Sequence, residues 1–212
     1  MCGIVSAFGE LALVFRRFFE RNAGVWPLPS EDGTLALRPI SDHDLEAVEE
    51  WFRDLELVRF AFGYDNVSDG ELERTAVGFV ERTRRYKRNS FAILDADDEI
   101  IGVTRFDSRT TYEGNVALVG IMLGRACDRG RGLGSKALRL FLKYLFETVK
   151  VDSVEMETAV YNTQASRSFQ KVGFELCERL VSIEGIDPDD WEPAAAPKLW
   201  LRFPKSKWFA QS

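Results

Sequence analysis

A glycine-rich turn between an apolar run and a helical pattern constrains the fold of this chain most. The turn at 129–134 reads Arg-Gly-Arg-Gly-Leu-Gly. A strand-like apolar run at 115–123 precedes it, and apolar residues at helical spacing follow it. The first N–H groups of a helix have no partner within the helix, and the helix dipole is positive there. Glycines let the main chain approach an anion without a Cβ in the way. The sequence therefore predicts a phosphate-bearing ligand bound around residues 125–136.

The spacing of the turn excludes two common phosphate-binding motifs. A Walker P-loop requires lysine directly after its second glycine, whereas Gly134 is followed by Ser135 and only then by Lys136. The dinucleotide motif G-x-G-x-x-G is absent, because the glycines stand at 130, 132 and 134. The pattern that fits is R-x-x-G-x-G, formed by Arg129, Gly132 and Gly134. On this turn alone, an ordinary tight connection between a strand and a helix remains the alternative.

A second motif follows the glycine-rich turn along the chain, and the two motifs together identify a protein family more specifically than the turn alone. Asn162 ends a strand-like stretch, and a short helix closed by Gly173 comes next. Together the two segments resemble the GNAT acetyltransferases, which share the pattern N-x-x-A/S…K-x-G-F, and the resemblance extends over roughly residues 34–205. The stretches at 120–124 and 35–40 resemble the subgroup of ribosomal-protein N-terminal acetyltransferases and their small-molecule relatives.

The resemblance implies an N-acetyltransferase that uses acetyl-CoA as cosubstrate. The acetyl group would pass to a primary amine, on a protein N terminus or a small molecule, by direct attack in a ternary complex. The family's cofactor-binding positions fall on three parts of this chain. They are the main chain of Ile121, Met122 and Leu123, the turn residues Arg129, Gly130, Arg131, Gly132, Leu133, Gly134 and Ser135, and then Asn162, Ser166 and Lys171.

The sequence indicates the general acid and the general base less clearly than the cofactor-binding residues. The family's usual acid is a tyrosine in the helix after the asparagine, and this chain has Phe169 there, which cannot donate a proton. Tyr161 is a candidate for the acid, and Asp107 and Glu157, on strand segments near the expected cleft, are candidates for the base. Water acting as the base is an alternative. Because the acid position is vacant, a non-catalytic CoA-binding regulatory module is the alternative function.

Composition argues against several classes of partner and indicates a cellular location. The formal net charge of −6 argues against nucleic acid as the main partner. Three cysteines without a C-x-x-C pair, together with a single histidine, argue against a metal site. No apolar run approaches the length of a membrane span, and the first residues lack the pattern of a signal peptide. We therefore expect a cytoplasmic protein.

The order of patterns predicts an α/β (α+β) fold, a GNAT-like mixed and mostly antiparallel sheet with helices on both faces. Strands are expected at 34–39, 90–95, 99–108, 114–124, 153–160, 174–183 and 198–204. Helices are expected at 4–20, 133–148 and 163–172. Two more are expected after capping boxes at Ser41/Asp44 and Ser68/Glu71, and these end near 53 and 86.

Three segments are expected along the chain. Residues 1–33 read as an amphipathic helix and a linker, 34–205 as the acetyltransferase-like domain, and 206–212 as a tail. The apolar stripe of the first helix predicts that it docks on the domain or pairs two copies, so a homodimer is one expectation. The segments 53–70 and 184–197 read as loops.

Overall fold

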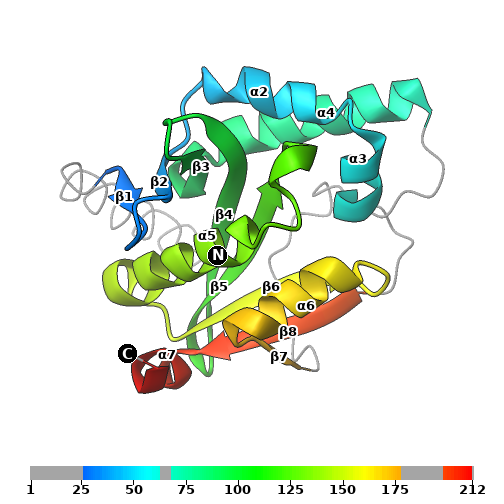
Figure 1. Cartoon of the computed structure of the whole chain (residues 1–212). Helices are drawn as coiled ribbons and strands as arrows, with labels where there is room; N and C mark the ends of the chain where they lie inside the picture. Colours follow the sequence, from blue (N-terminus) through cyan, green and yellow to red (C-terminus); the bar gives the residue numbers. More distant parts are fainter. Residues whose placement is uncertain (1–25, 63–67, 178–197, 212) are drawn as a thin grey trace, which may run out of the picture.

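The computed structural model describes residues 26–62, 68–177 and 198–211, and within them one eight-stranded sheet forms the centre of the molecule (Figure 1). The strands lie in the order β1-β2-β3-β4-β5-β6-β8-β7. The strands are β1 (Leu28–Pro29), β2 (Leu35–Pro39), β3 (Ser90–Asp95), β4 (Ile100–Thr111), β5 (Gly114–Leu123), β6 (Ser153–Ala159), β7 (Glu175–Leu176) and β8 (Lys198–Pro204). The helices are α2 (Asp44–Trp51), α3 (Leu55–Phe62), α4 (Asp69–Arg85), α5 (Leu133–Lys143), α6 (Thr163–Val172) and α7 (Lys205–Gln211).

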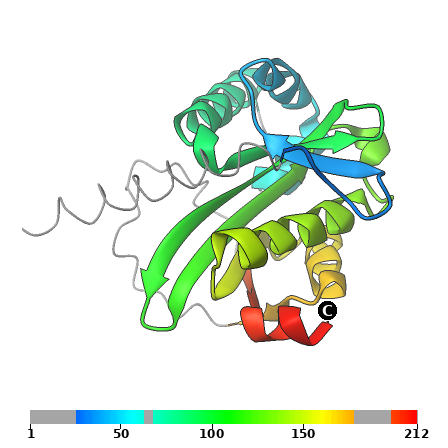
Figure 2. The ribbon, with the colours of Figure 1, turned by 90° about the vertical axis from the view of Figure 1, so that its left-hand side faces the viewer.

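Two groups of helices cover the two faces of the sheet (Figure 2). Side chains of α5 and α6 share one apolar cluster with the sheet, and side chains of α2, α3 and α4 share the other. The alternation along β5 separates the clusters, since Val119, Ile121 and Leu123 belong to the first and Met122 to the second. Phe91 and Phe141 lie at the centre of the first cluster, with ring centroids 5.4 Å apart.

Strand direction agrees with the predicted mixed sheet. Every neighbouring pair of strands is antiparallel except β5 and β6, which are parallel. The parallel pair needs a crossover, and α5 provides it. The predicted fold class is therefore confirmed.

Capping explains where two of the helices begin. The N–H of Ser68 donates to Glu71, and α4 starts directly after Ser68, as its capping box predicts. The N–H of Ser41 donates to the Asp44 carboxylate at 2.6 Å, although α2 begins only at Asp44 itself. In the second box, therefore, only the hydrogen bond from the Ser41 N–H back to the Asp44 side chain matches the prediction, and it fixes the turn before the helix.

Four segments differ from the sequence-based prediction. The stretch expected as a loop after residue 53 contains α3, and the expected tail contains α7. The expected linker contributes β1 and Trp26, whose ring lies 5.1 Å from that of Phe91. The predicted helix at 133–148 is α5 followed by a π-helical turn, η3 (Tyr144–Val149).

Some predictions fall outside the described residues. These are the helix at 4–20, most of the strand at 174–183 and the loop at 184–197. Among the described helices, none is long and apolar enough to cross a lipid bilayer.

Candidate functional site

A fork between β5 and β6 forms the centre of the candidate site. The two strands pair only from Val116 to Val119 on β5 and from Ser153 to Met156 on β6. Beyond these residues β5 continues to Leu123, still paired with β4 on its other side. The main chain of the last four residues of β5 therefore has no ladder partner on the β6 side. Polar main-chain groups in such a place are available to a ligand.

The predicted main-chain contacts lie at this fork. Ile121 and Leu123 turn their side chains to the cluster under α5, and Met122 turns its side chain to the cluster under α2 and α3. All three side chains are half-buried. Their packing leaves only their main-chain groups to face the gap between the strands.

Two helix N-termini point to the same end of the sheet as the fork. Because β5 and β6 are parallel, α5 and α6 both begin near the C-terminal ends of these strands. A Cβ built on Gly130 would lie 4.0 Å from Nε2 of Gln164, in the first turn of α6. The glycine-rich turn and the start of α6 are thus neighbours.

The turn itself has the main-chain geometry that glycine permits. Gly130 and Gly132 have φ angles of +74° and +81°, and Gly132 is the N-cap residue of α5. The first main-chain hydrogen bond of α5 runs from the N–H of Lys136 to the carbonyl of Gly132. No side chain caps this helix start in the described structure. The N–H groups of Leu133, Gly134 and Ser135 therefore match an anion site at the positive end of the helix dipole.

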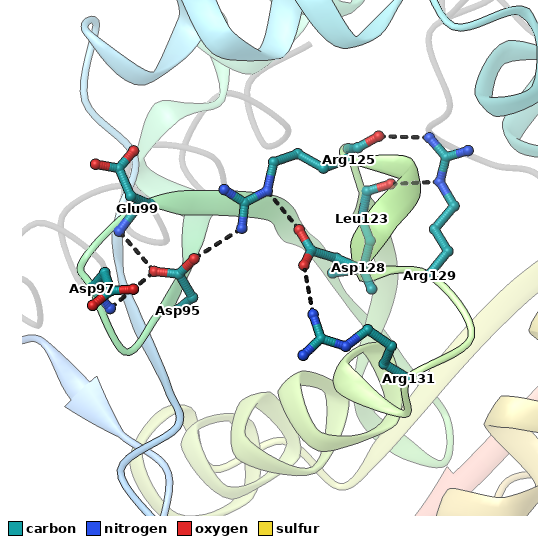
Figure 3. A network of polar contacts seen from close by, with 9 residues as sticks. Asp95, Asp97, Glu99, Leu123, Arg125, Asp128, Arg129 and Arg131 are labelled. Carbon is teal, nitrogen blue, oxygen red and sulfur yellow. Dashed lines mark hydrogen bonds and ion pairs between the residues drawn. The ribbon is translucent and has the colours of Figure 1, made fainter.

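An ion-pair network joins the turn to neighbouring parts of the chain (Figure 3). The Arg125 guanidinium joins Asp95, at the end of β3, to Asp128, in the short helix η2 (Ala126–Asp128), at 2.8 and 2.6 Å. Asp128 is buried, and Arg131 lies 3.3 Å from its second oxygen. The hydrogen bonds that Arg125 donates to Asp128 and Asp95 raise the pKa of its guanidinium. This network ties the turn to the β3–β4 connection.

Arg129 uses its side chain differently from a simple phosphate contact. Its guanidinium donates to the Asp54 carboxylate at 2.7 Å and to the carbonyl of Gly124 at 2.6 Å. It also lies 3.5 Å from the carbonyl of Leu123, a contact drawn in Figure 3. Gly124 follows β5 directly, and a Cβ there would meet the ring of Trp51 at 1.9 Å. Arg129 thus fastens the end of β5 to the start of α3.

The remaining predicted cofactor residues lie at the start of α6 and along this helix. Asn162 caps α6 by accepting a hydrogen bond from the N–H of Ala165 at 3.1 Å. Ser166 is buried on the inner face of α6, whereas Lys171 is exposed and its carbonyl accepts from Arg139. Ser166 therefore contributes to packing.

Tyr161 and Phe169 have distinct surroundings. The Tyr161 hydroxyl donates to the carbonyl of Arg59 in α3 at 3.2 Å, and the side chain is 41% exposed. Phe169 is buried in the cluster under α5, with its ring centroid 6.3 Å from that of Phe174. Tyr161 thus lies partly exposed just beyond the end of β6, and Phe169 is a core residue.

Asp107 and Glu157 lie on the face of the sheet opposite α5. Asp107 pairs with Arg105 at 2.5 Å, and Glu157 pairs with Lys198 at 2.8 Å. Glu157 is the first β6 residue beyond the paired part of the fork. Across the fork from it, Gly120 is exposed and carries no side chain. Of the two carboxylates, Glu157 is therefore the one at the fork.

Asp54 is a residue of the site that sequence reasoning missed. Its Oδ1 accepts from the N–H groups of Glu56 and Leu57, at 2.9 and 3.3 Å, and so caps α3, while its Oδ2 binds Arg129. Burial opposes ionisation, but these hydrogen bonds together lower the pKa of Asp54. An aspartate directly before Leu55-Glu56-Leu57 is a helix-start signal that could have revealed α3.

The described residues contain no group of three or more His, Cys, Asp or Glu side chains arranged to hold a metal ion. The fork and the turn offer main-chain donors, a helix N-terminus and nearby carboxylate and phenol groups.

Comparisons with known proteins agree with this geometry. A family model described as an acetyltransferase (GNAT) domain matches residues 34–175. The chain is 26% identical over 170 residues to the probable N-acetyltransferase YjcK of Bacillus subtilis (strain 168), with 75% of this chain and 90% of that protein covered. It is 24% identical over 171 residues to aminoglycoside N(6')-acetyltransferase type 1 of Serratia marcescens, with 74% and 83% covered.

Solved structures share the fold. The structure of aminoglycoside acetyltransferase AAC(6')-Ib in complex with coenzyme A matches with a TM-score of 0.61 at 19% identity, covering 84% of this chain and all of that chain (100%). Spermidine N-acetyltransferase from Vibrio cholerae in complex with CoA and spermine matches with a TM-score of 0.58 at 18% identity, covering 83% and 98%.

Proposed function

Because the chain belongs to the GNAT acetyltransferase family and is an acyl-CoA-dependent N-acetyltransferase, we propose that it acetylates a small cationic primary amine. The proposal goes beyond the family in naming the acceptor class. A protein N terminus, which the resemblance to the ribosomal-protein subgroup suggests, is the second candidate.

The unpaired main chain of β5 at the fork is the observation that supports the proposed acetyl-CoA site. Main-chain groups of Ile121, Met122 and Leu123 would pair with the amide groups of pantetheine and with the acetyl carbonyl of acetyl-CoA. The pyrophosphate would accept hydrogen bonds from the start of α5 at 133–135, with Gly130 and Gly132 giving the phosphates close access. Three more side chains complete the proposed acetyl-CoA site. Arg131 would lie beside the pyrophosphate, and Asn162 and Lys171 would lie beside the pantetheine arm.

Two observations support a small cationic acceptor. The named relative from Serratia acts on aminoglycosides, and the Vibrio enzyme of the same fold is bound to spermine; both are polycationic amines. The negative net charge of this chain suits an ammonium-bearing ligand.

Acetyl transfer needs few catalytic groups once both substrates are held together. The amine must lose a proton, the developing oxyanion needs a main-chain donor, and the thiolate must leave. We assign the base to Glu157, acting directly or through a water molecule, because of its place at the fork. We assign protonation of the leaving thiolate to Tyr161, whose present partner is a main-chain carbonyl that water could replace.

A panel assay tests the acceptor. Release of free thiol from acetyl-CoA would be measured with spermidine, kanamycin, simple primary amines and peptides with free N termini. We expect turnover with at least one polycationic small amine at a kcat/KM tenfold or more above that of any peptide. Turnover with peptides alone would assign the protein to N-terminal acetylation. Tight CoA binding without turnover on any amine would support the regulatory-module alternative.

A further inference from the structure

We propose that Asp54 and Arg129 couple the two substrate sites, so that binding of coenzyme A fixes α3 and thereby forms one wall of the amine site. Asp54 is a positioning residue in this proposal, because it acts on the substrates through α3 and Arg129. The inference rests on the proposed cofactor site at the fork and goes further by assigning a role to the helix beside it.

The position of α3 is the first observation. Leu57 and Val58 of α3 are buried in the cluster that also contains Met122, at the open part of the fork. On its other side, the carbonyl of Arg59 accepts a hydrogen bond from Tyr161, at the end of β6. Figure 1 shows α3 beside the end of β6, across from α6. This short helix therefore contacts both arms of the fork.

The second observation is how α3 is fastened to the cofactor turn. Arg129 begins the glycine-rich turn, and its guanidinium reaches Asp54 at 2.7 Å and lies 3.7 Å from Glu56. The same guanidinium donates to the carbonyl of Gly124, at the end of β5. A main-chain shift at 129–132 is thus passed to the first turn of α3 by a charge-assisted hydrogen bond.

The turn is the part of this linkage that a ligand would fix. Gly130 and Gly132 come one and three residues after Arg129, and both are exposed with positive φ angles. Pyrophosphate held by the N–H groups at 133–135 would restrict these glycines and, with them, the direction of the Arg129 side chain. Coupling of this kind is reciprocal, so the amine must also tighten coenzyme A binding by the same factor.

One substitution separates the two roles of Asp54. In Asp54→Asn the side-chain oxygen can still cap α3, because asparagine and aspartate are equally good N-cap residues. The amide NH₂ then faces the Arg129 guanidinium, so two donors meet and the ion pair is lost. Asp42→Asn is the matched control, since it removes an exposed ion pair of the same length, 2.7 Å, to Lys87 far from the fork.

Hydrogen–deuterium exchange of the full chain, with and without saturating coenzyme A, tests the coupling without knowledge of the amine. In the wild type and in Asp42→Asn we expect exchange to slow at least threefold both at 125–136 and at 55–62. In Asp54→Asn we expect slowing at 125–136 only. Slowing at 55–62 that persists in Asp54→Asn, or that never occurs, overturns the coupling. Absence of any effect at 125–136 overturns the proposed cofactor site itself, and the two failures are therefore distinguishable.

Kinetics with the best amine from the panel give a second readout. We expect Asp54→Asn to raise the KM for the amine and the KM for acetyl-CoA by the same factor, at least fivefold, each measured with the other substrate saturating. The kcat should stay within threefold, and the Kd for coenzyme A without amine within twofold, whereas general structural damage would change these two as well. An unchanged KM for the amine, or a rise in only one of the two KM values, contradicts the proposal.

Discussion

Aspartates in this protein often accept hydrogen bonds from an arginine and from main-chain N–H groups at the same time. Asp44 binds Arg38 and the N–H of Ser41, and Asp54 binds Arg129 and two N–H groups of α3. Asp95 does the same with Arg125. The short side chain lets one carboxylate cap a turn and hold a distant arginine. The pKa of all three carboxyl groups lies below its ordinary value despite burial.

The buried Asp44 predicts a defined loss of stability in acid. Burial alone would raise its pKa, but Arg38 and Ser41 lower it to about 2 from an ordinary value of 3.8. A lowered pKa stabilises the fold above pH 4, and this contribution disappears as the pH falls through 2. We expect Asp44→Asn to cost about 2 kcal/mol at pH 6 and progressively less between pH 4 and pH 2. Urea unfolding across this range measures it, with the exposed Glu46→Gln as control; a cost independent of pH contradicts the ion pair's role.

Gly134 tests the anion site without disturbing the turn. A Cβ there would make ordinary contact with Leu123 at 3.7 Å, so Gly134→Val should fold. The branched side chain would stand among the N–H groups that we assign to pyrophosphate, and we expect the Kd for coenzyme A to rise at least tenfold, about 1.4 kcal/mol. Gly78→Val is the control, because a Cβ at that site in α4 meets nothing within 4 Å. Calorimetric titration compares the two, and equal Kd values would argue against this site.

The two candidate carboxylates, Asp107 and Glu157, can be ranked by kinetics. We expect Glu157→Gln to lower kcat about 10²-fold, as loss of a general base does. Asp107→Asn should change kcat less than threefold, since Asp107 lies on β4, away from the fork. Steady-state assays with both substrates saturating give the comparison. The opposite ranking would move the base to Asp107, and small effects in both variants would leave water as the base.

At the scale of elements, regular patterns were predictable and short ones were not. The strands β2, β3, β5 and β8 follow their apolar runs closely, because each run has few competing conformations. The stretch at 55–62 mixes helical and strand periods within eight residues, so its helix depends on the cap at Asp54 and on packing against Met122. Likewise β1 has only two residues and forms through its partner β2.

The helix α7 shows how packing creates an element that composition does not reveal. The Trp208 ring stacks on Phe146 of the π-helical turn at a centroid distance of 5.8 Å, and Lys207 pairs with Glu175. We expect Trp208→Ala to lower the free energy of unfolding by about 1–2 kcal/mol. The neighbouring Phe209→Ala should cost little, because Phe209 is 55% exposed. Urea denaturation of both variants checks this, and equal costs would exclude a specific role for the stacked ring.

At the scale of the whole molecule, the family resemblance predicted main-chain cofactor contacts at 121–123 and the glycine-rich turn, whereas the contacts that join these parts to α3 came only from the structure. The role expected of Ile121 is what the resemblance implies for its position before the turn. The contacts from Arg129 to Asp54 and from Tyr161 to Arg59 join residues 75 and 102 positions apart. Such pairs depend on the packing of α3, and a single sequence carries no local signal for them.

Residues 26–32, which precede the predicted domain, also pack against it. Residues 26–32 contribute Trp26 to the main cluster, β1 to the sheet edge and Asp32 to an ion pair with Lys136. We expect a chain beginning at residue 34 to unfold with a free energy about 2–4 kcal/mol lower than that of a chain beginning at Trp26. Urea denaturation compares them, and residues 1–25 are absent from both chains. Matching midpoints would support the predicted boundary at 33.

The fork lets this protein keep an unpaired strand edge without exposing it to other chains. Exposed edges invite strand addition and aggregation, and proteins commonly keep their outer strands short for that reason. Here the outermost described strands, β1 and β7, have two residues each. The long free edge of β5 is instead recessed between β4 and β6. A second folded chain cannot reach it side-on, whereas a single narrow, linear molecule can enter lengthwise.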